Sequence, residues 1–196
     1  MKKFSSFLIA LSLYLPITVI NAEIIIDGKL DEDEWKEARQ ITSFYEVFPY
    51  TLNPVEDIKT IILIQESSEG IFLGFKNYQS NESMRSQSHQ RDNERSIADK
   101  NGVTIDFDAD KLSGYQFFVS SSGSIGDATY RNENERSYDW DADWLSAAST
   151  EDGVWYSEMF IPWTVAPMKA QSGEQRKVRM AFYRMLAGPQ RVIATI

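Results

Sequence analysis

The stretch "DWDADWLSAASTEDGVWYSEMFIPW", residues 139–163, is the part of the sequence that decides the fold. Successive side chains of a β-strand point to opposite faces, and both faces of residues 154–161 are rich in apolar side chains. This pattern predicts a central strand that is covered on both sides and ends at Pro162, which cannot donate to a ladder. Glu158 would then be a buried acid, and we expect an arginine to pair with it, because an unpaired buried charge is costly.

Alternation with a period of two continues over much of the remaining chain. Residues 30–38, "LDEDEWKEA", instead predict one short N-terminal helix, with Asp31 and Glu34 in a capping-box pattern and Trp35 in the core. The predicted strands are 41–45, 58–65, 71–77, 102–108, 115–120, 125–130, 144–149, 154–161, 178–184 and 192–196. Short strands with turn-rich separators predict an all-β fold, an antiparallel, jelly-roll-like β-sandwich of about ten strands.

Residues 1–22 have a basic start, a short apolar run and Ala22 at a suitable cleavage position, which predicts a secretory signal peptide. Residues 23–196 are expected to form one module in the periplasm, at the outer membrane or outside the cell. Without Lys2 and Lys3 the net charge changes from −9 to −11, and the chain has no cysteine. Such an acidic chain argues against nucleic acid as a partner, and without disulfides it depends on its core or on a metal.

The sequence has no signature of an enzyme with a nucleophile. It has no Gly-x-Ser-x-Gly motif, no cysteine and a single histidine, His89, in a polar segment. A catalytic triad needs a base that a third group orients, so His89 alone does not indicate catalysis. Paired carboxylates could serve glycoside hydrolysis. A glycoside hydrolase remains the second hypothesis, because the acids are too numerous for one pair to stand out.

Two acidic runs are candidate cation sites. "DFDAD" contributes Asp106 and Asp108, and "DWDAD" contributes Asp139 and Asp141. Neither run continues as an EF-hand loop, and Ca²⁺ prefers six to eight oxygen ligands, more than one run supplies. We therefore expect calcium only at a composite site, and the alternative for each run is a solvated strand face.

The tryptophans beside the second run indicate a binding surface. Burying Trp140 would draw its two flanking aspartates toward the core, which favours an exposed position, whereas Trp144 could equally belong to the core. A pyranose presents flat C–H faces to an aromatic ring, and carboxylates and arginines bind its hydroxyls. Trp140 and Trp144 are thus the predicted ligand platform, with Arg91, Asp92 and Asp99 of the long polar segment as the polar contacts.

Several motifs in order resemble the family 9 carbohydrate-binding module-like domain. The resemblance covers most of residues 24–184, and the run between Trp140 and Trp163 is its most specific part. It is similar to the version at the N-terminus of secreted bacterial proteins with an uncharacterised C-terminal region that is expected to lie in the outer membrane. The motifs are "IDGKLDEDEWKEA" (26–38), "RD" (91–92) with Asp99 ahead of "VTIDFD" (103–108), "YQFFVSSSGSIGD" (115–127), the stretch 138–163 and "FYR" (182–184).

The resemblance implies a β-sandwich that binds a glycan or oligosaccharide, with bound calcium, tryptophans that stack on sugar and no catalysis by this domain. It also implies a chain truncated at its C-terminus, because the large C-terminal region of that version does not follow residue 196. Two alternatives stay open. The chain could be part of a glycoside hydrolase that acts in polysaccharide breakdown, or an interaction or plug domain of an outer-membrane protein without a sugar role.

Overall fold

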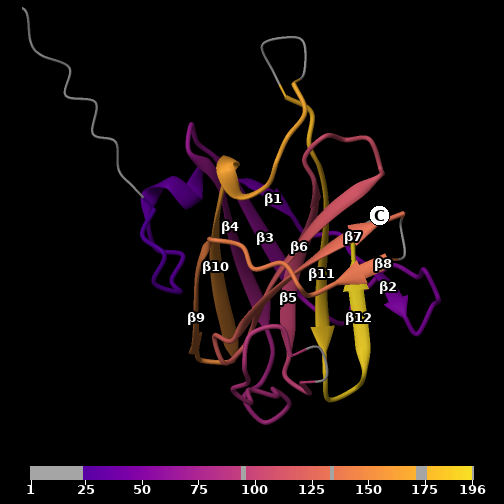
Figure 1. Ribbon diagram of the computed structural model, residues 1–196. Coiled ribbons are helices and arrows are strands. Elements are labelled where there is room, and N and C mark those ends of the chain that lie inside the picture. The colour runs from indigo at the N-terminus through magenta and orange to yellow at the C-terminus, as the bar shows by residue number, and fades with distance from the viewer. Residues whose placement is uncertain (1–23, 94–95, 133–134, 171–175, 196) are drawn as a thin grey trace, which may run out of the picture.

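The computed structural model describes residues 24–93, 96–132, 135–170 and 176–195. Two antiparallel sheets pack face to face (Figure 1), with the strand orders β1-β3-β4-β10-β9 and β2-β12-β11-β5-β6-β7-β8. We call them the five-stranded and the seven-stranded sheet. The predicted all-β antiparallel sandwich is confirmed, with twelve strands rather than about ten.

Short strands and two single-turn 3₁₀ helices, η1 (Asp33–Lys36) and η2 (Trp163–Val165), make up the regular structure. The strands are β1 (Arg39–Ile41), β2 (Tyr45–Phe48), β3 (Thr60–Glu66), β4 (Gly70–Tyr78), β5 (Lys100–Asp106), β6 (Ser113–Ser120), β7 (Ile125–Arg131), β8 (Glu135–Ser137), β9 (Leu145–Glu151), β10 (Val154–Pro162), β11 (Arg179–Leu186) and β12 (Arg191–Ala194).

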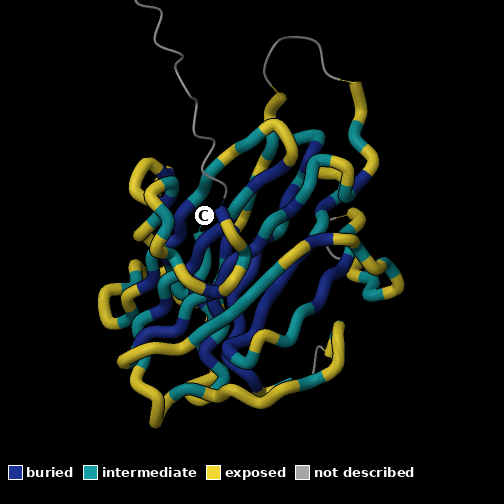
Figure 2. The backbone as a smooth tube through the Cα atoms, turned by 90° about the vertical axis from the view of Figure 1, so that its left-hand side faces the viewer, coloured by how far each residue is buried: buried dark blue, intermediate teal, exposed yellow. Residues whose placement is uncertain are grey.

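Strand β10 is covered on both faces, as the sequence predicts. Its inner face contributes Met159 and Ile161 to the main core between the sheets. Its outer face lies under the N-terminal segment, where Trp35 and Leu63 belong to a second, smaller core. Trp35 is only 3 % exposed, which confirms its predicted core position. In Figure 2 the buried residues lie mostly along the strands and the exposed residues mostly in the connections.

Two local predictions are wrong, and one strand was missed. The predicted strand 41–45 is a crossover, because the chain leaves the five-stranded sheet after β1 and enters the seven-stranded sheet at β2, with Phe44 buried between them. β-branched and aromatic residues, which favour strands, run through this crossover, so the sequence does not reveal it. The predicted capping box is also absent, since Glu32 is the N-cap residue of η1 and makes no side-chain cap bond. Strand β8 was not predicted.

Glu158 is fully buried as expected, but its partner is not an arginine. Its Oε2 accepts hydrogen bonds from the backbone N–H groups of Gly28, at 2.7 Å, and Asp27, at 3.0 Å. Its Oε1 accepts one from Trp35 Nε1 at 3.2 Å. Burial raises the pKa of this carboxyl from 4.5 to about 7. Glu158 therefore fastens the N-terminal segment to the outer face of the five-stranded sheet.

The long polar segment between β4 and β5 is irregular wherever the structure describes it, as the sequence predicts. The predicted signal peptide, residues 1–22, lies outside the described residues. Within the described ranges, none of the helices has the length and apolar character needed to cross a membrane.

Candidate functional site

Several sequence-predicted site residues gather around Asp127 of β7, which is fully buried. The Asp127 carboxylate accepts hydrogen bonds from Trp144 Nε1 at 2.9 Å and from the Ala142 N–H at 3.2 Å, and it pairs with the Arg91 guanidinium. Arg91 also donates to the Ala142 carbonyl at 2.8 Å and lies 3.2 Å from the Asp141 carboxylate. These contacts hold the segment that precedes β9 against the seven-stranded sheet.

Asp92 and Trp144 belong to the same cluster and face inward. Oδ1 of Asp92 accepts a hydrogen bond from the Asp127 N–H at 2.7 Å. Burial raises the pKa of the Asp92 carboxyl, and the neighbouring Asp127 charge acts in the same direction. Trp144 is only 7 % exposed and has no free face for a sugar. Both residues stabilise the fold at this position, so we do not include them in the proposed binding site.

Trp140 is the member of the predicted set that offers an aromatic surface. It is half-buried, and its ring packs edge-on against Tyr115 and Phe117, with centroids 4.9 Å and 5.9 Å away. The flanking Asp139 and Asp141 are exposed. Trp140 thus sits at the edge of the core, with one side against the sheet and the other toward solvent.

Asp99 lies apart from this cluster and is fully buried. Its carboxylate accepts hydrogen bonds from the Ala187 N–H at 2.6 Å, Gln79 Nε2 at 2.7 Å and the Arg85 N–H at 2.9 Å. Asp99 therefore joins the β4–β5 connection to the β11–β12 connection, and it offers no exposed oxygen to a ligand.

The four predicted metal ligands do not come together. Asp106 accepts hydrogen bonds from the N–H groups of Asp108 and Lys111, which closes the turn after β5. Asp108 binds the Lys169 N–H and Arg176, while Asp139 binds the Ser137 hydroxyl. Across the described ranges, no group of three or more metal-binding side chains is present. Calcium stays a prediction from the sequence and carries no part of the site described below.

A groove of about 1230 Å³ lies where the two sheets part. It lies between β1, β3 and β4 of the five-stranded sheet and β11 of the seven-stranded sheet, and we call it the inter-sheet groove. It is lined by the apolar side chains Ile41, Ile64, Ile71, Trp163, Met168, Val178, Met180 and Phe182 and by the polar side chains Glu37, Arg39, Gln65, Glu66, Ser67, Ser68 and Arg176. Ile41, Ile64 and Met180 pack against the main core but are only half-buried, and all three line the groove.

Trp163 is fixed at the mouth of this groove. It begins η2 immediately after Pro162, and its backbone N–H donates to the Glu69 carbonyl at 2.9 Å. Its Nε1 donates to the Ser67 carbonyl at 3.0 Å, which holds the indole against the β3–β4 turn. The side chain is half-buried. Because both polar groups of Trp163 are paired, the part of the indole that remains open is apolar.

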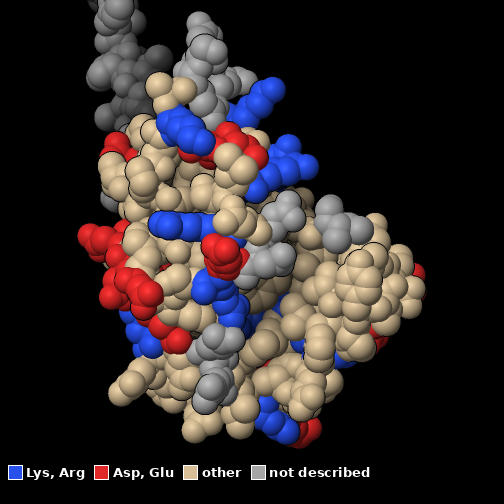
Figure 3. Space-filling view, turned by 45° about the vertical axis from the view of Figure 1, so that its right-hand side comes forward, with Lys and Arg blue, Asp and Glu red and all other residues tan. Residues whose placement is uncertain are grey.

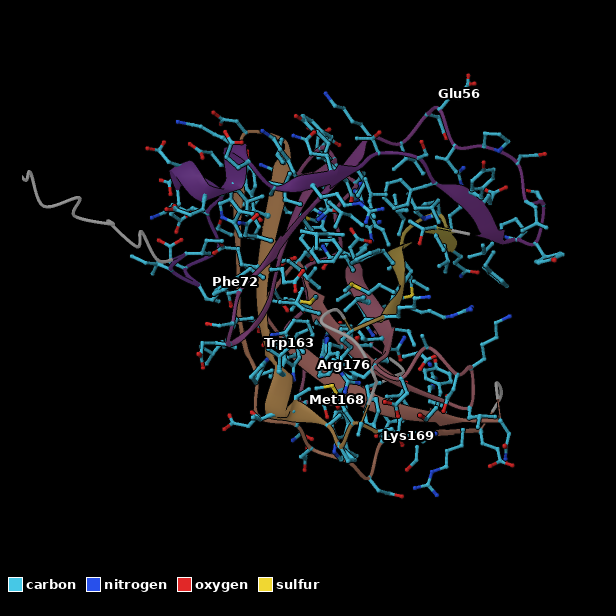
Figure 4. All side chains as sticks on the ribbon, turned by 90° about the horizontal axis from the view of Figure 1, so that it is seen from above. Glu56, Phe72, Trp163, Met168, Lys169 and Arg176 are labelled. Carbon is cyan, nitrogen blue, oxygen red and sulfur yellow. The ribbon has the colours of Figure 1, made fainter. Side chains whose placement is uncertain are left out.

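Arg176 lies across the groove from this turn and is also held in place. Its guanidinium donates to the Phe107 carbonyl at 3.2 Å, to Asp108 Oδ1 at 3.3 Å and to the Lys169 carbonyl at 2.6 Å. Figure 4 shows Trp163, Met168 and Arg176 gathered at the groove, with Phe72 away from them. An aromatic ring, a thioether and a fixed guanidinium thus share one opening.

A second aromatic surface lies on the seven-stranded sheet. The Arg136 guanidinium is 5.9 Å from the Tyr130 ring and 4.8 Å from the Tyr138 ring. Burial raises the pKa of the nearby Tyr183 phenol, with Tyr130 and Tyr138 acting in the same direction. A pocket of about 380 Å³ adjoins Tyr130, much smaller than the inter-sheet groove.

Sequence reasoning missed the inter-sheet groove. Trp163 closes the quoted stretch, and its position after a strand-ending proline was the available signal that it does not belong to the strand. No spacing in the sequence brings it to Glu37, Arg39 or Arg176, because these residues come from segments far apart in the chain.

Comparison with solved structures gives the architecture a close match. A family 9 carbohydrate-binding module from Caldicellulosiruptor kristjanssonii, solved with cellotriose, aligns over 88 % of this chain and 78 % of its own, with a TM-score of 0.58 and 11 % identity. The fold is that of a family 9 carbohydrate-binding module. The same organism's module solved with glucose aligns over 88 % of this chain and 81 % of its own, with a TM-score of 0.59 and 11 % identity.

A candidate carbohydrate-binding protein from Bacteroides uniformis also aligns, over 79 % of this chain and 78 % of its own, with a TM-score of 0.56 and 14 % identity. No protein-family model matches the sequence. No curated protein matches it either. The resemblance stated from the motifs is thus supported at the level of the fold.

Proposed function

We propose that this chain is a non-catalytic module that binds a glycan in the inter-sheet groove. The observation that carries the proposal is the half-buried Trp163, held with its apolar surface open in the inter-sheet groove of a fold shared with a cellotriose-bound module. A sugar ring needs such an apolar face on one side and hydrogen-bonding side chains around its edge.

The rim of the groove supplies hydrogen-bonding side chains for the edge of a sugar ring. Gln65 offers both donors and acceptors, Glu37 and Glu66 offer acceptors, and Arg39 and Arg176 offer donors. Each hydroxyl of a sugar donates one hydrogen bond and accepts others, so a mixed rim suits a neutral glycan better than a charged ligand. On the face drawn in Figure 3, acidic and basic side chains are likewise interspersed rather than separated by sign.

The proposal assigns no catalytic step to the chain. Glu158 has a raised pKa, as a general acid would, but it faces the N-terminal segment and not the groove. Its oxygens bind Gly28 and Trp35, which leaves no access for a glycosidic oxygen. We further propose that the module acts outside the cytoplasm, on the basis of the signal peptide expected from the sequence.

Affinity electrophoresis in gels that contain soluble polysaccharides tests the proposal. Cellulose derivatives are the first choice, since the structurally similar module binds cellotriose, followed by xylans, mannans and β-glucans. The wild-type chain should be retarded in at least one gel. Trp163→Ala should abolish the retardation, because loss of a central aromatic contact weakens binding about tenfold or more.

Trp140→Ala is the matched control, since it removes the half-buried tryptophan of the surface predicted from the sequence. This variant should bind like the wild type. If it loses binding while Trp163→Ala retains it, the glycan lies at the Trp140 surface and the groove assignment is wrong. If the folded wild-type chain is not retarded in any gel, the proposed function itself is wrong.

A further inference from the structure

A layer of polar side chains crosses the core between the two sheets, away from every surface described above. Asn77 of β4 lies opposite Trp155 of β10 in the five-stranded sheet. Arg184 of β11 lies opposite Asn101 of β5 in the seven-stranded sheet. All four residues are fully buried. Ser157 connects the two sheets here, since its hydroxyl donates to Asn101 Oδ1 at 2.9 Å.

Arg184 spans the same gap from the other side. One of its terminal nitrogens donates to the Thr60 hydroxyl at 2.8 Å, and the other donates to Gln79 Oε1 at 2.7 Å. Its Cζ lies 6.0 Å from the centre of the Trp155 ring. Arg184 thus approaches Trp155 across the core. Asn101 and Asn77 are their neighbours on the adjacent strands, so the four residues lie in one buried polar layer.

Five polar atoms in this layer have no hydrogen-bond partner among the described residues. They are Asn77 Nδ2, Asn77 Oδ1, Asn101 Nδ2, Trp155 Nε1 and Arg184 Nε. A buried polar atom without a partner costs about 1–3 kcal/mol, and native cores rarely leave several unpaired together. A small guest that supplies the missing partners would remove this cost.

The chemistry of the unpaired atoms indicates what the guest is. Four of them are N–H donors and only one is an acceptor. A water molecule donates as many hydrogen bonds as it accepts, so water alone fits such a set poorly, whereas a halide only accepts.

The charge of the layer also favours an anion. Arg184 is bound in the layer only by neutral oxygens, and Gln79 separates it from the Asp99 carboxylate, whose Oδ2 accepts from Gln79 Nε2 at 2.7 Å. A buried cation without a carboxylate in direct contact favours an anion beside it.

We propose that the core of this module holds a small monovalent anion between Arg184, Trp155, Asn77 and Asn101, and that the anion stabilises the pairing of the two sheets. The proposal concerns the interior of the sandwich and is independent of glycan binding. The ligand is defined by its size and charge, and chloride and bromide are the probes.

Thermal unfolding of the full chain in sodium chloride and in sodium gluconate, at equal ionic strength and pH, tests the proposal. Gluconate is too large for a site inside the core. The melting temperature should be higher in chloride by about 4 °C or more and should rise with concentration until it saturates, as for any ligand that binds only the folded state. Equal melting temperatures in the two salts would overturn the proposal and indicate that water is the partner of the unpaired atoms.

Asn101→Asp provides a sharper variant, because it places a fixed carboxylate beside Arg184 and retains an acceptor for Ser157. Its melting temperature should no longer depend on chloride. Asn81→Asp adds the same charge at an exposed position and should keep the chloride dependence. If Asn101→Asp does not fold, bromide-soaked crystals of the wild-type chain decide: an anomalous peak beside Arg184 Nε supports the proposal, and its absence contradicts it.

Discussion

The buried carboxyl of Glu158 makes the stability of this domain depend on pH in an uncommon direction. Most carboxylates in folded proteins are stabilised in their charged form, so folding weakens as pH falls. Glu158 has its pKa raised from 4.5 to about 7, because burial disfavours its charge. The folded state thus binds a proton more tightly than the unfolded state, and the contribution of this group to stability is lost as pH rises through 7.

The size of the effect follows from the pKa difference. At 1.36 kcal/mol per pKa unit, a change from 4.5 to about 7 amounts to roughly 3 kcal/mol between pH 4.5 and pH 8. This is an upper value, because a small opening of the N-terminal segment at high pH would let water reach the charged carboxylate. We expect a loss of about 1–3 kcal/mol in the free energy of unfolding.

Urea denaturation followed by tryptophan fluorescence at pH 5, 6, 7 and 8 measures this loss. Glu158→Gln should remove most of the slope, whereas Glu56→Gln, at an exposed position, should keep it. Asp92 also makes the free energy of unfolding fall as pH rises, since burial raises the pKa of its carboxyl. The decisive quantity is therefore the difference in pH dependence between Glu158→Gln and Glu56→Gln. A wild-type stability that is constant or increases from pH 5 to pH 8 would refute the reasoning.

Three further predictions concern stability. Arg91→Met should lower the free energy of unfolding by about 2–3 kcal/mol, because it leaves the buried Asp127 carboxylate without its cation. Urea denaturation measures this loss. A loss below 0.5 kcal/mol, about what a surface change costs, would contradict the prediction. Gly28→Ala should lower the free energy of unfolding by about 1–3 kcal/mol, since φ is +88° and the new Cβ would lie 2.9 Å from the backbone of β9. Gly123→Ala, at φ +81° with open space around it, should be less destabilising when thermal unfolding of the two variants is compared. The calcium expected from the sequence predicts a higher melting temperature in CaCl₂ than in EDTA, an effect that Asp141→Asn should reduce, and equal values would contradict it.

The sequence predicted the central strand because its evidence is local. Apolar residues at both odd and even positions between Val154 and Ile161 are sufficient to indicate two covered faces, and β10 has them. The crossover at Phe44 was missed for the complementary reason. Its residues are mostly of types that favour strands, and only the separation of the two sheets shows that the chain passes from one to the other.

Long-range partners were harder to predict than burial. Glu158 was correctly placed in the interior, but its donors are backbone N–H groups about 130 positions earlier in the chain, and no residue type marks such a donor. Arg91 and Trp144 were predicted to contact a ligand, and the structure joins both to Asp127, the last residue of the motif 115–127, to which the sequence assigned no role. The inter-sheet groove depends on how far the sheets part, and this is a property of the packed structure alone.

Isothermal titration calorimetry of the folded chain with cello- and xylo-oligosaccharides tests the central claim most directly. The account predicts saturable binding of at least one of them, with one site per chain, and loss of the signal in Trp163→Ala but not in Trp140→Ala. The absence of binding heat for every oligosaccharide, with calcium present and folding verified by circular dichroism, would contradict the claim that this sandwich is a glycan-binding module.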